Sequence, residues 1–128
     1  MAWNFDAVNK YGAKKITENG ETFDSRKEYL RWVELNMMQR AGEITNLERQ
    51  VKFVLIPAQR EPDTVGPKGG KRKGKVIEKE CSYIADFRYT DVWTGETVVE
   101  DAKGMKTEVY KIKKKLMLFR HGIRIKEV

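Results

Sequence analysis

The period of the hydrophobic pattern changes along the chain, and the changes predict a core of helix, three strands, helix and strand. Apolar residues recur at helical spacing over residues 25–42 and again over 107–122. Strand-like runs occupy 44–57, 81–89 and 97–103, and the last six residues, which begin with alternating apolar and polar positions, are expected to be a closing strand. This order predicts an α/β fold, and the length of 128 residues suits a single domain, 1–128.

The first predicted helix has clear signals at both ends. Ser25-x-x-Glu28 is typical of a capping box, with Asp24 as an alternative N-cap, and Gly42 is placed to end the helix. The expected buried stripe is Leu30, Val33, Met37 and Ala41, widened by Tyr29, Trp32 and Leu35. Such a width suits a helix packed over a sheet.

The second predicted helix begins at Thr107 or Lys106 and ends at Gly122. Its expected buried stripe is Val109, Ile112, Leu116 and Phe119. Lysines 111, 114 and 115 are expected on or near the exposed side.

A turn within residues 91–95 joins the second and third strands and brings charged residues together. If Thr94-Gly95 is the turn centre, Asp86 faces Lys103; a register shifted by two places Asp86 opposite Asp101. Asp101 and Lys103 share a strand face in either case, whereas Glu100 has the opposite parity and should face away. The two registers stay open at this point.

Two further segments lack a core pattern. Residues 1–9 are expected to be a flexible tail, Lys14 and Lys15 could line a phosphate backbone, and Asn19-Gly20 indicates a hairpin tip. Residues 60–79 contain almost nothing to bury and are expected to be a flexible basic loop inside the domain. The cations of this loop, Lys68, Lys71, Arg72, Lys73 and Lys75, suit either phosphate contact or a solvated hairpin tip.

Charge and composition narrow the class of partner. The chain has 26 lysines and arginines against 19 acidic residues, so its net charge is +7. This charge favours a polyanionic partner and argues against binding through an acidic surface. Cys81 is the single cysteine, which excludes a disulfide framework or a cysteine-rich zinc site. No signal peptide or membrane-spanning run is evident, so we expect a soluble cytoplasmic protein without a membrane partner.

The clustered acids indicate a specific chemistry. Carboxylate oxygens suit Mg²⁺ or Mn²⁺, and a lysine beside such an ion can orient a water or offset charge on a phosphoryl group. Asp86 and Asp101 supply two carboxylates, and Glu28 on the first helix is the candidate for a third. The alternative is a salt-bridge cluster in which Asp86 pairs with Lys103 or Arg88 and Asp101 pairs with Arg88.

The element order and the pattern Glu28, Asp86, Asp101-Ala102-Lys103 resemble the PD-(D/E)xK nuclease superfamily, which includes restriction endonucleases and archaeal Holliday junction resolvases. The proline of that motif is absent, since Ala85 precedes Asp86. Further motifs resemble a small phage and prophage endonuclease-like family long catalogued as a domain of unknown function. They are Lys14-Lys15, Phe23-Asp24-Ser25-x-x-Glu28, Gly42-Glu43-Ile44-x-x-Leu47, Gln50-x-x-Phe53, Tyr83-Ile84-Ala85-Asp86-Phe87, Val99 to Gly104, Thr107-x-x-Tyr110-x-x-Lys113 and Gly122-Ile123.

The resemblance implies a restriction-endonuclease-like αβββαβ core with a mixed central sheet flanked by helices. It implies Glu28, Asp86, Asp101 and the Ala102 carbonyl as metal ligands and Lys103 as the catalytic lysine. Polar positions expected to line the cleft are Gln50, Thr107, Tyr110 and Lys113.

The sequence therefore predicts a Mg²⁺- or Mn²⁺-dependent DNA endonuclease. We expect it to act in phage recombination, replication or packaging within a bacterial host, with branched DNA as one candidate substrate. A homodimer would suit symmetric cutting of two strands. Two alternatives remain: a nucleic-acid-binding module that does not cut, and a phage adaptor protein whose basic surface contacts another protein.

Overall fold

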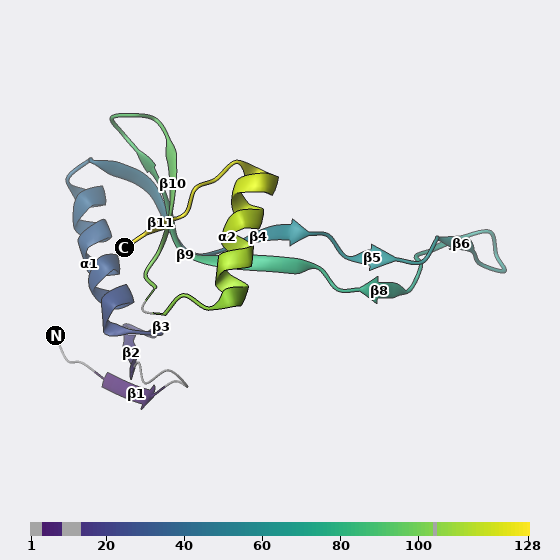
Figure 1. Ribbon diagram of the computed structural model, residues 1–128, viewed down its shortest axis with the longest axis horizontal. Coiled ribbons are helices and arrows are strands. Elements are labelled where there is room, and N and C mark those ends of the chain that lie inside the picture. Colours follow the sequence, from purple (N-terminus) through teal and green to yellow (C-terminus); the bar gives the residue numbers. More distant parts are fainter. Residues whose placement is uncertain (1–3, 9–13, 104) are drawn as a thin grey trace.

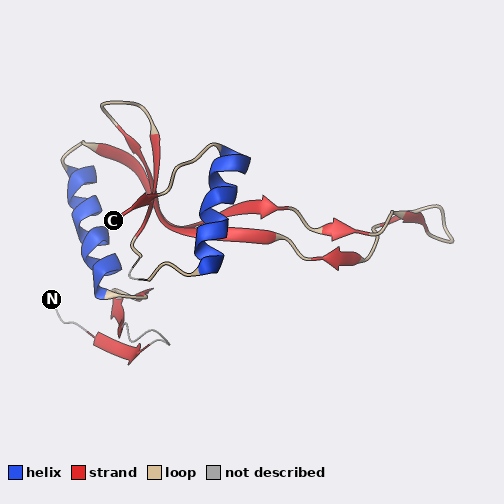
Figure 2. Ribbon diagram, in the orientation of Figure 1, coloured by secondary structure: helices blue, strands red, loops and turns tan. Residues whose placement is uncertain are grey.

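A four-stranded mixed sheet forms the centre of the computed structural model, which describes residues 4–8, 14–103 and 105–128. Its order is β11-β10-β9-β4, with β4 Ile44–Ile56, β9 Cys81–Asp91, β10 Thr97–Asp101 and β11 Lys126–Glu127. Strands β4, β9 and β10 are antiparallel, and β11 runs parallel to β10. Helices α1 (Arg26–Arg40) and α2 (Glu108–His121) pack against this sheet (Figures 1 and 2), which confirms the predicted α/β fold.

Alternation along β10 directs successive side chains toward different helices. Val98 packs with the core under α1, whereas Val99 is buried in the core under α2. Glu100 then bonds to Arg31 of α1, while Asp101 contacts Tyr83 in the other core. Glu100 does face away from Asp101, as its parity predicted, but it is fully buried and paired.

The turn between β9 and β10 fixes which of the two predicted registers occurs. The Asp91 carboxylate accepts the Trp93 and Thr94 amides at 2.8 and 3.1 Å, and the Asp91 amide donates to the Glu96 carbonyl at 2.9 Å. Asp and Asn side chains favour such turns because they replace a backbone acceptor. The pairs Thr97–Thr90 and Glu100–Phe87 follow, so the ladder continues to Asp101 opposite Asp86. The register with Asp86 facing Lys103 is wrong.

Helix α1 buries only part of the predicted stripe, on the side of Tyr29, Trp32 and Leu35. Ser25 is the N-cap and accepts the Glu28 amide, as expected. Leu30 and Met37, however, are 46% and 61% exposed, and the buried face carries Glu28, Tyr29 and Leu35, with Trp32 and Met38 packed beside them. Trp32 stacks on Phe87 of β9, with ring centroids 6.0 Å apart. This aromatic contact joins the buried face of α1 to the sheet.

Helix α2 shows the same kind of error. Its caps are Thr107 and Gly122, the latter in the left-handed conformation at φ +66°, as the sequence indicated. The buried residues are Tyr110 and Met117, whereas the predicted stripe residues Val109, Ile112 and Phe119 are exposed. Neither helix, within the described part of the chain, is long and apolar enough to cross a membrane.

A small N-terminal sheet covers the start of α1. Its strands are β1 Asn4–Val8, β2 Lys14–Glu18 and β3 Glu21–Phe23. The β2–β3 hairpin turns at Asn19-Gly20, as predicted, and both residues have positive φ. Of the segment expected to be a tail, residues 4–8 form β1, while 1–3 and 9 lie outside the described residues. Ile16 and Phe23 are buried with Tyr29 of α1 in a core of their own.

Residues 57–80 form a long hairpin, here called the arm, that extends β4 and β9 away from the body of the protein (Figure 1). Its short strands are β5 Gln59–Arg60, β6 Thr64–Val65, β7 Lys71–Arg72 and β8 Val76–Glu78, with β5 paired to β8 and β6 to β7. The segment predicted as a loop therefore has a paired backbone. Its side chains remain exposed, in agreement with the hairpin-tip alternative.

Candidate functional site

Two aspartates from neighbouring strands form the centre of the candidate site. Asp86 of β9 accepts the Ala102 amide at 2.9 Å, and Asp101 at the end of β10 is fully buried. Tyr83 donates its hydroxyl to Asp101 Oδ2, while Asp101 Oδ1 is buried and has no hydrogen-bond partner among the described residues. A buried carboxylate oxygen that lacks a donor is costly unless a cation faces it.

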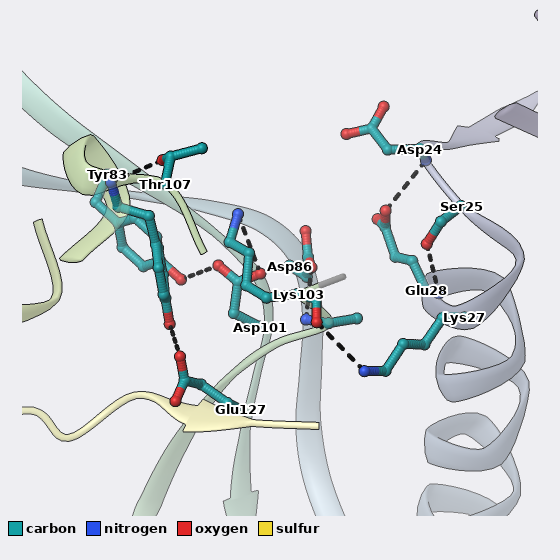
Figure 3. A network of polar contacts seen from close by, with 12 residues as sticks. Asp24, Ser25, Lys27, Glu28, Tyr83, Asp86, Asp101, Lys103, Thr107 and Glu127 are labelled. Atoms are coloured by element: carbon teal, nitrogen blue, oxygen red, sulfur yellow. Dashed lines mark hydrogen bonds and ion pairs between the residues drawn. The ribbon is translucent and has the colours of Figure 1, made fainter. Parts of the chain in front are cut away.

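Lys103 supplies the nearest positive charge. Its Nζ lies 3.4 Å from Asp101 Oδ1, which is ion-pair distance although no hydrogen bond forms. The same Nζ lies 4.9 Å from the centroid of the Tyr110 ring, and the Lys103 carbonyl accepts the Lys27 ammonium at 3.4 Å. The lysine is thus held at the rim of the acidic pair by elements from both helices (Figure 3).

Gln50 connects Glu28 to the aspartates. Its amide nitrogen lies 3.2 Å from Glu28 Oε1 and 3.5 Å from Asp86 Oδ1. Gln50 adopts φ +51° inside strand β4, a left-handed conformation that non-glycine residues rarely adopt. Strained backbone of this kind concentrates at functional sites, because the surrounding structure must hold it in place.

Asp86 is held in an environment that disfavours its charge. Burial, followed by the negative charges of Glu28 and Asp101, raises the pKa of Asp86 from 3.8 to about 8, against the lowering effect of the Ala102 amide. Figure 3 shows Asp86 lying between Asp101 and Glu28. A bound cation would restore the ionised form of a half-buried carboxylate that has such repelling neighbours.

Glu28 is buried near the N-terminus of α1 but is already bonded. It accepts the Asp24 amide at 3.1 Å and lies 3.3 Å from the Arg49 guanidinium. Burial is the largest influence and raises the pKa of Glu28, while the Asp24 amide and Arg49 lower it. Glu28 therefore reaches Asp86 through Gln50 and not by direct contact.

A groove of about 330 Å³ opens beside Lys103, between β9 and the start of α2. It is lined by Ser82, Tyr83, Ile84, Lys103, Thr107, Val109, Tyr110 and Lys113. The lining includes three of the polar residues that the sequence placed in the cleft. Two ammonium groups at one groove favour a negatively charged ligand.

A model of the family described as "Protein of unknown function (DUF1064)" matches residues 8–126. The chain belongs to the DUF1064 family. No curated protein and no solved structure matches it significantly.

The acidic residues of this DUF1064 protein fit a hard divalent cation in donor chemistry, since carboxylate and carbonyl oxygens are what Mg²⁺ and Mn²⁺ prefer. Asp101 Oδ1, which has only the Lys103 ion pair among the described residues, and the charge repulsion at Asp86 favour a cation at this position. Over residues 4–8, 14–103 and 105–128, no three His, Cys, Asp or Glu side chains are arranged to hold one metal ion together. Of the three acids predicted as metal ligands, Glu28 is the one separated from the others, because it is bonded to Arg49 and Gln50.

The structure brings most predicted site residues to one region of the DUF1064 protein and leaves others outside it. Asp86, Asp101, Ala102, Lys103, Gln50 and Tyr110 are linked by the contacts above, and Thr107 and Lys113 line the groove. Lys71, Arg72 and Lys73 lie at the far end of the arm (Figure 1). Lys14 and Lys15 lie on β2 in the N-terminal sheet.

The predicted salt bridges involving Arg88 are wrong. Arg88 pairs with Glu48 at 2.8 Å and leaves both aspartates to other partners. The proposed Asp86–Lys103 pair is also replaced, because Lys103 lies against Asp101.

Sequence reasoning missed several residues that support the site. Tyr83 bonds Asp101, and Arg49 holds Glu28 while its guanidinium lies 3.9 Å from the Phe23 ring centroid. Burial and then the Asp101 hydrogen bond raise the pKa of Tyr83, so this residue stays a hydrogen-bond donor. Tyr83 was visible only as part of an apolar strand, and nothing local to Arg49 indicated its partner.

Proposed function

We propose that this DUF1064 protein is a metal-dependent DNA endonuclease that hydrolyses phosphodiester bonds. The observation that carries the proposal is the pair of adjacent carboxylates, Asp86 and Asp101, with Lys103 at their rim. Two acids and a lysine at the end of a strand hairpin, beside a cationic groove, suit phosphoryl transfer. The resemblance to PD-(D/E)xK nucleases points to the same chemistry.

Asp86, Asp101 and the Ala102 carbonyl would hold Mg²⁺ or Mn²⁺. Glu28 would not bind the ion directly but would help to position Asp86 through the Gln50 side chain, which contacts both carboxylates. The bound ion would supply Lewis-acid polarisation of a phosphoryl oxygen and a lowered pKa for water. Tyr83 keeps Asp101 in position by its hydrogen bond, and Gln50 orients Asp86. These residues therefore set the geometry before any substrate arrives.

Lys103 would serve the reaction directly. Its ammonium group can donate hydrogen bonds to the attacking water or to the phosphoryl oxygens, where negative charge develops. Packing over the Tyr110 ring limits its freedom, so the ammonium remains near the reacting phosphate.

DNA is proposed as the substrate because the chain carries +7 net charge and its groove presents Lys103 and Lys113. The role would lie in phage recombination, replication or packaging in the bacterial cytoplasm. Branched or junction DNA is the substrate form to test first.

A homodimer, which symmetric cutting of two strands would require, stays a prediction. Sedimentation of the protein with and without a four-way junction tests it. A single chain on each junction would contradict it.

The engagement of Glu28 favours one second candidate. Because Arg49 and Gln50 already bond this acid, the site could hold DNA without cutting it. That binding module would bind DNA equally well with and without chelator, and its binding would be insensitive to Asp86→Asn.

The test is a cleavage panel with supercoiled plasmid, linear duplex and four-way junction DNA in Mg²⁺, Mn²⁺ or EDTA. We expect cleavage with either metal and none with EDTA. Binding of every DNA form without cleavage in any metal would favour the second candidate. Absence of both binding and cleavage would remove DNA as the substrate.

A further inference from the structure

The arm is a direct continuation of the strands that carry the candidate site. Residues 57–80 extend β4, which holds Gln50, and β9, which holds Asp86 (Figure 1). A strand rises about 3.3 Å per residue, so a twelve-residue branch spans at most roughly 40 Å, or about ten to twelve base pairs of duplex. Whatever the arm contacts is therefore held at a defined distance from the acids.

The outer half of the arm is cationic, and most of its cations have no ion pair among the described residues. Between Thr64 and Ile77 the sequence has five lysines or arginines and no acid, and all five are exposed. Among the described residues only Lys71 of these five has an ion pair, at 3.4 Å from Asp63. A hollow of about 320 Å³ at the tip is lined by Gly66, Pro67, Lys68, Gly70, Lys71 and Arg72. These cations face solvent and a concave surface.

The arm is also braced by contacts that use its glycines. Gly74 donates to the Asp63 carboxylate at 3.0 Å, and its carbonyl accepts the Arg60 guanidinium at 2.9 Å. A Cβ at position 74 would lie 1.8 Å from the Glu61 carbonyl oxygen, so only glycine allows the two branches to meet there. At the tip, the Gly66 amide donates to the Gly70 carbonyl at 2.7 Å. The cations are thus presented on a braced ribbon.

The composition of the arm distinguishes duplex from single-stranded nucleic acid. Proteins that bind single strands stack bases on aromatic side chains, and residues 57–80 contain no Phe, Tyr or Trp. A two-stranded β-ribbon fits the major groove of B-form DNA, which is about 12 Å wide. The lysines and arginines suit phosphates on either side of such a groove.

We propose that the arm lies in a groove of the duplex DNA that flanks the cleavage site, with Lys68, Arg72 and Lys73 on backbone phosphates. The inference rests on the proposed function and adds a second, distant contact to its substrate. The contact should not depend on the DNA sequence, because side chains that bind phosphates do not read the bases.

The test measures binding by fluorescence anisotropy in EDTA, so that no cutting is needed. The probe is a 40-base-pair duplex, compared with a single strand of equal length and with polyglutamate. The variant Lys68→Gln/Arg72→Gln/Lys73→Gln should weaken duplex binding about 10- to 100-fold near 0.1 M salt and reduce the salt slope by about two to three. Binding to the single strand should change less than threefold.

The matched control is Lys115→Gln/Arg120→Gln/Arg124→Gln, which removes the same charge from exposed positions of α2 and the segment after it. We expect this control to retain duplex affinity within threefold. Equal losses in the two triple variants would mean that only net charge matters and would overturn the proposal. Duplex affinity within twofold of the unaltered protein for the arm variant, or tighter binding of polyglutamate than duplex, would also overturn it.

Gly74→Val tests the geometry without changing charge. It should disturb the crossing of the two branches and weaken duplex binding at least fivefold, while circular dichroism and the thermal midpoint of the body stay unchanged. Unaltered duplex binding by Gly74→Val would contradict a braced arm. If the unaltered protein binds duplex through the arm but does not cleave DNA, the proposed nuclease function is refuted and the proposed arm contact stands. If the arm variant cleaves and binds duplex as well as the unaltered protein, only the proposed arm contact is refuted.

Discussion

Asp86→Asn should stabilise the metal-free protein at alkaline pH. The folded state holds the Asp86 proton up to about pH 8, whereas the unfolded chain releases it near pH 3.8. Between these values the folded state binds more protons than the unfolded state, so the free energy of unfolding falls as pH rises. Asparagine cannot ionise, and its side-chain oxygen can still accept the Ala102 amide.

The magnitude follows from the two pKa values. One pKa unit corresponds to about 1.4 kcal/mol, so the full displacement would be on the order of 6 kcal/mol above pH 8. Asp86 is only half-buried, so water screens part of this, and we expect a measured gain of about 2–3 kcal/mol at pH 8. At pH 5 only the unfolded state is ionised at this position, so about a quarter of the gain is already present, and the two proteins should have equal stability only below about pH 3.

The assay is urea unfolding in EDTA at pH 5, 6, 7 and 8, with both proteins at each pH. Adding Mg²⁺ at pH 8 should then stabilise the unaltered protein, by about 2.7 kcal/mol at a hundredfold excess over Kd, and leave Asp86→Asn unchanged. A difference in the free energy of unfolding between the two proteins that stays constant from pH 5 to pH 8 would show that the pKa of Asp86 is not raised in the folded state.

Three further predictions concern the neighbouring residues. Arg31→Met leaves buried Glu100 with only the more distant Lys126, at 3.9 Å, as a cationic partner among the described residues and should lower the free energy of unfolding by about 3 kcal/mol. Arg31→Met/Glu100→Gln should recover part of this loss, and urea unfolding of both variants checks it. Ser25→Ala removes the N-cap acceptor of α1 and should cost about 1 kcal/mol by the same assay, whereas a change below 0.3 kcal/mol would contradict the cap. Lys103→Met should lower the single-turnover cleavage rate by at least about 100-fold, while Mg²⁺ still raises the thermal midpoint of the variant. Loss of the Mg²⁺-induced rise together with loss of cleavage would indicate a structural role for Lys103 instead.

Element order and caps could be read from the sequence because they depend on local signals. Ser25, Thr107 and Gly122 act within one turn of their own helices, so their neighbours along the chain contain the information. The β9–β10 register was narrowed to two choices, and the Asp91 turn selects between them. Local turn chemistry therefore placed Asp86 beside Asp101.

The buried face of each helix could be read only in part. Periodicity placed Tyr29, Trp32 and Leu35 of α1 in the buried stripe, but tertiary contacts decide which apolar positions of each helix face the sheet. In α2 the choice falls on Tyr110, whose hydroxyl donates to Glu127 at 2.9 Å and whose ring lies 6.3 Å from that of Tyr83. These partners come from distant parts of the chain, so periodicity alone favoured the wrong stripe.

The candidate site shows the same division. Asp86, Asp101 and Lys103 follow from strand parity and pairing, whereas the partners of Glu28 depend on how α1 sits on β4. Arg49 and Gln50 contact Glu28 from a part of β4 that follows an irregularity between Thr45 and Glu48 and is left-handed at Gln50. A β-bulge of this kind has no dependable sequence signature.

The most direct measurement is the conversion of supercoiled plasmid by the unaltered protein, Asp101→Asn and the exposed control Glu96→Gln, purified in parallel. We expect nicked or linear product with Mg²⁺ or Mn²⁺ for the unaltered protein and for Glu96→Gln. We expect no product above background for Asp101→Asn or in EDTA. Equal cleavage by Asp101→Asn, or cleavage that persists in EDTA, would contradict the proposed function.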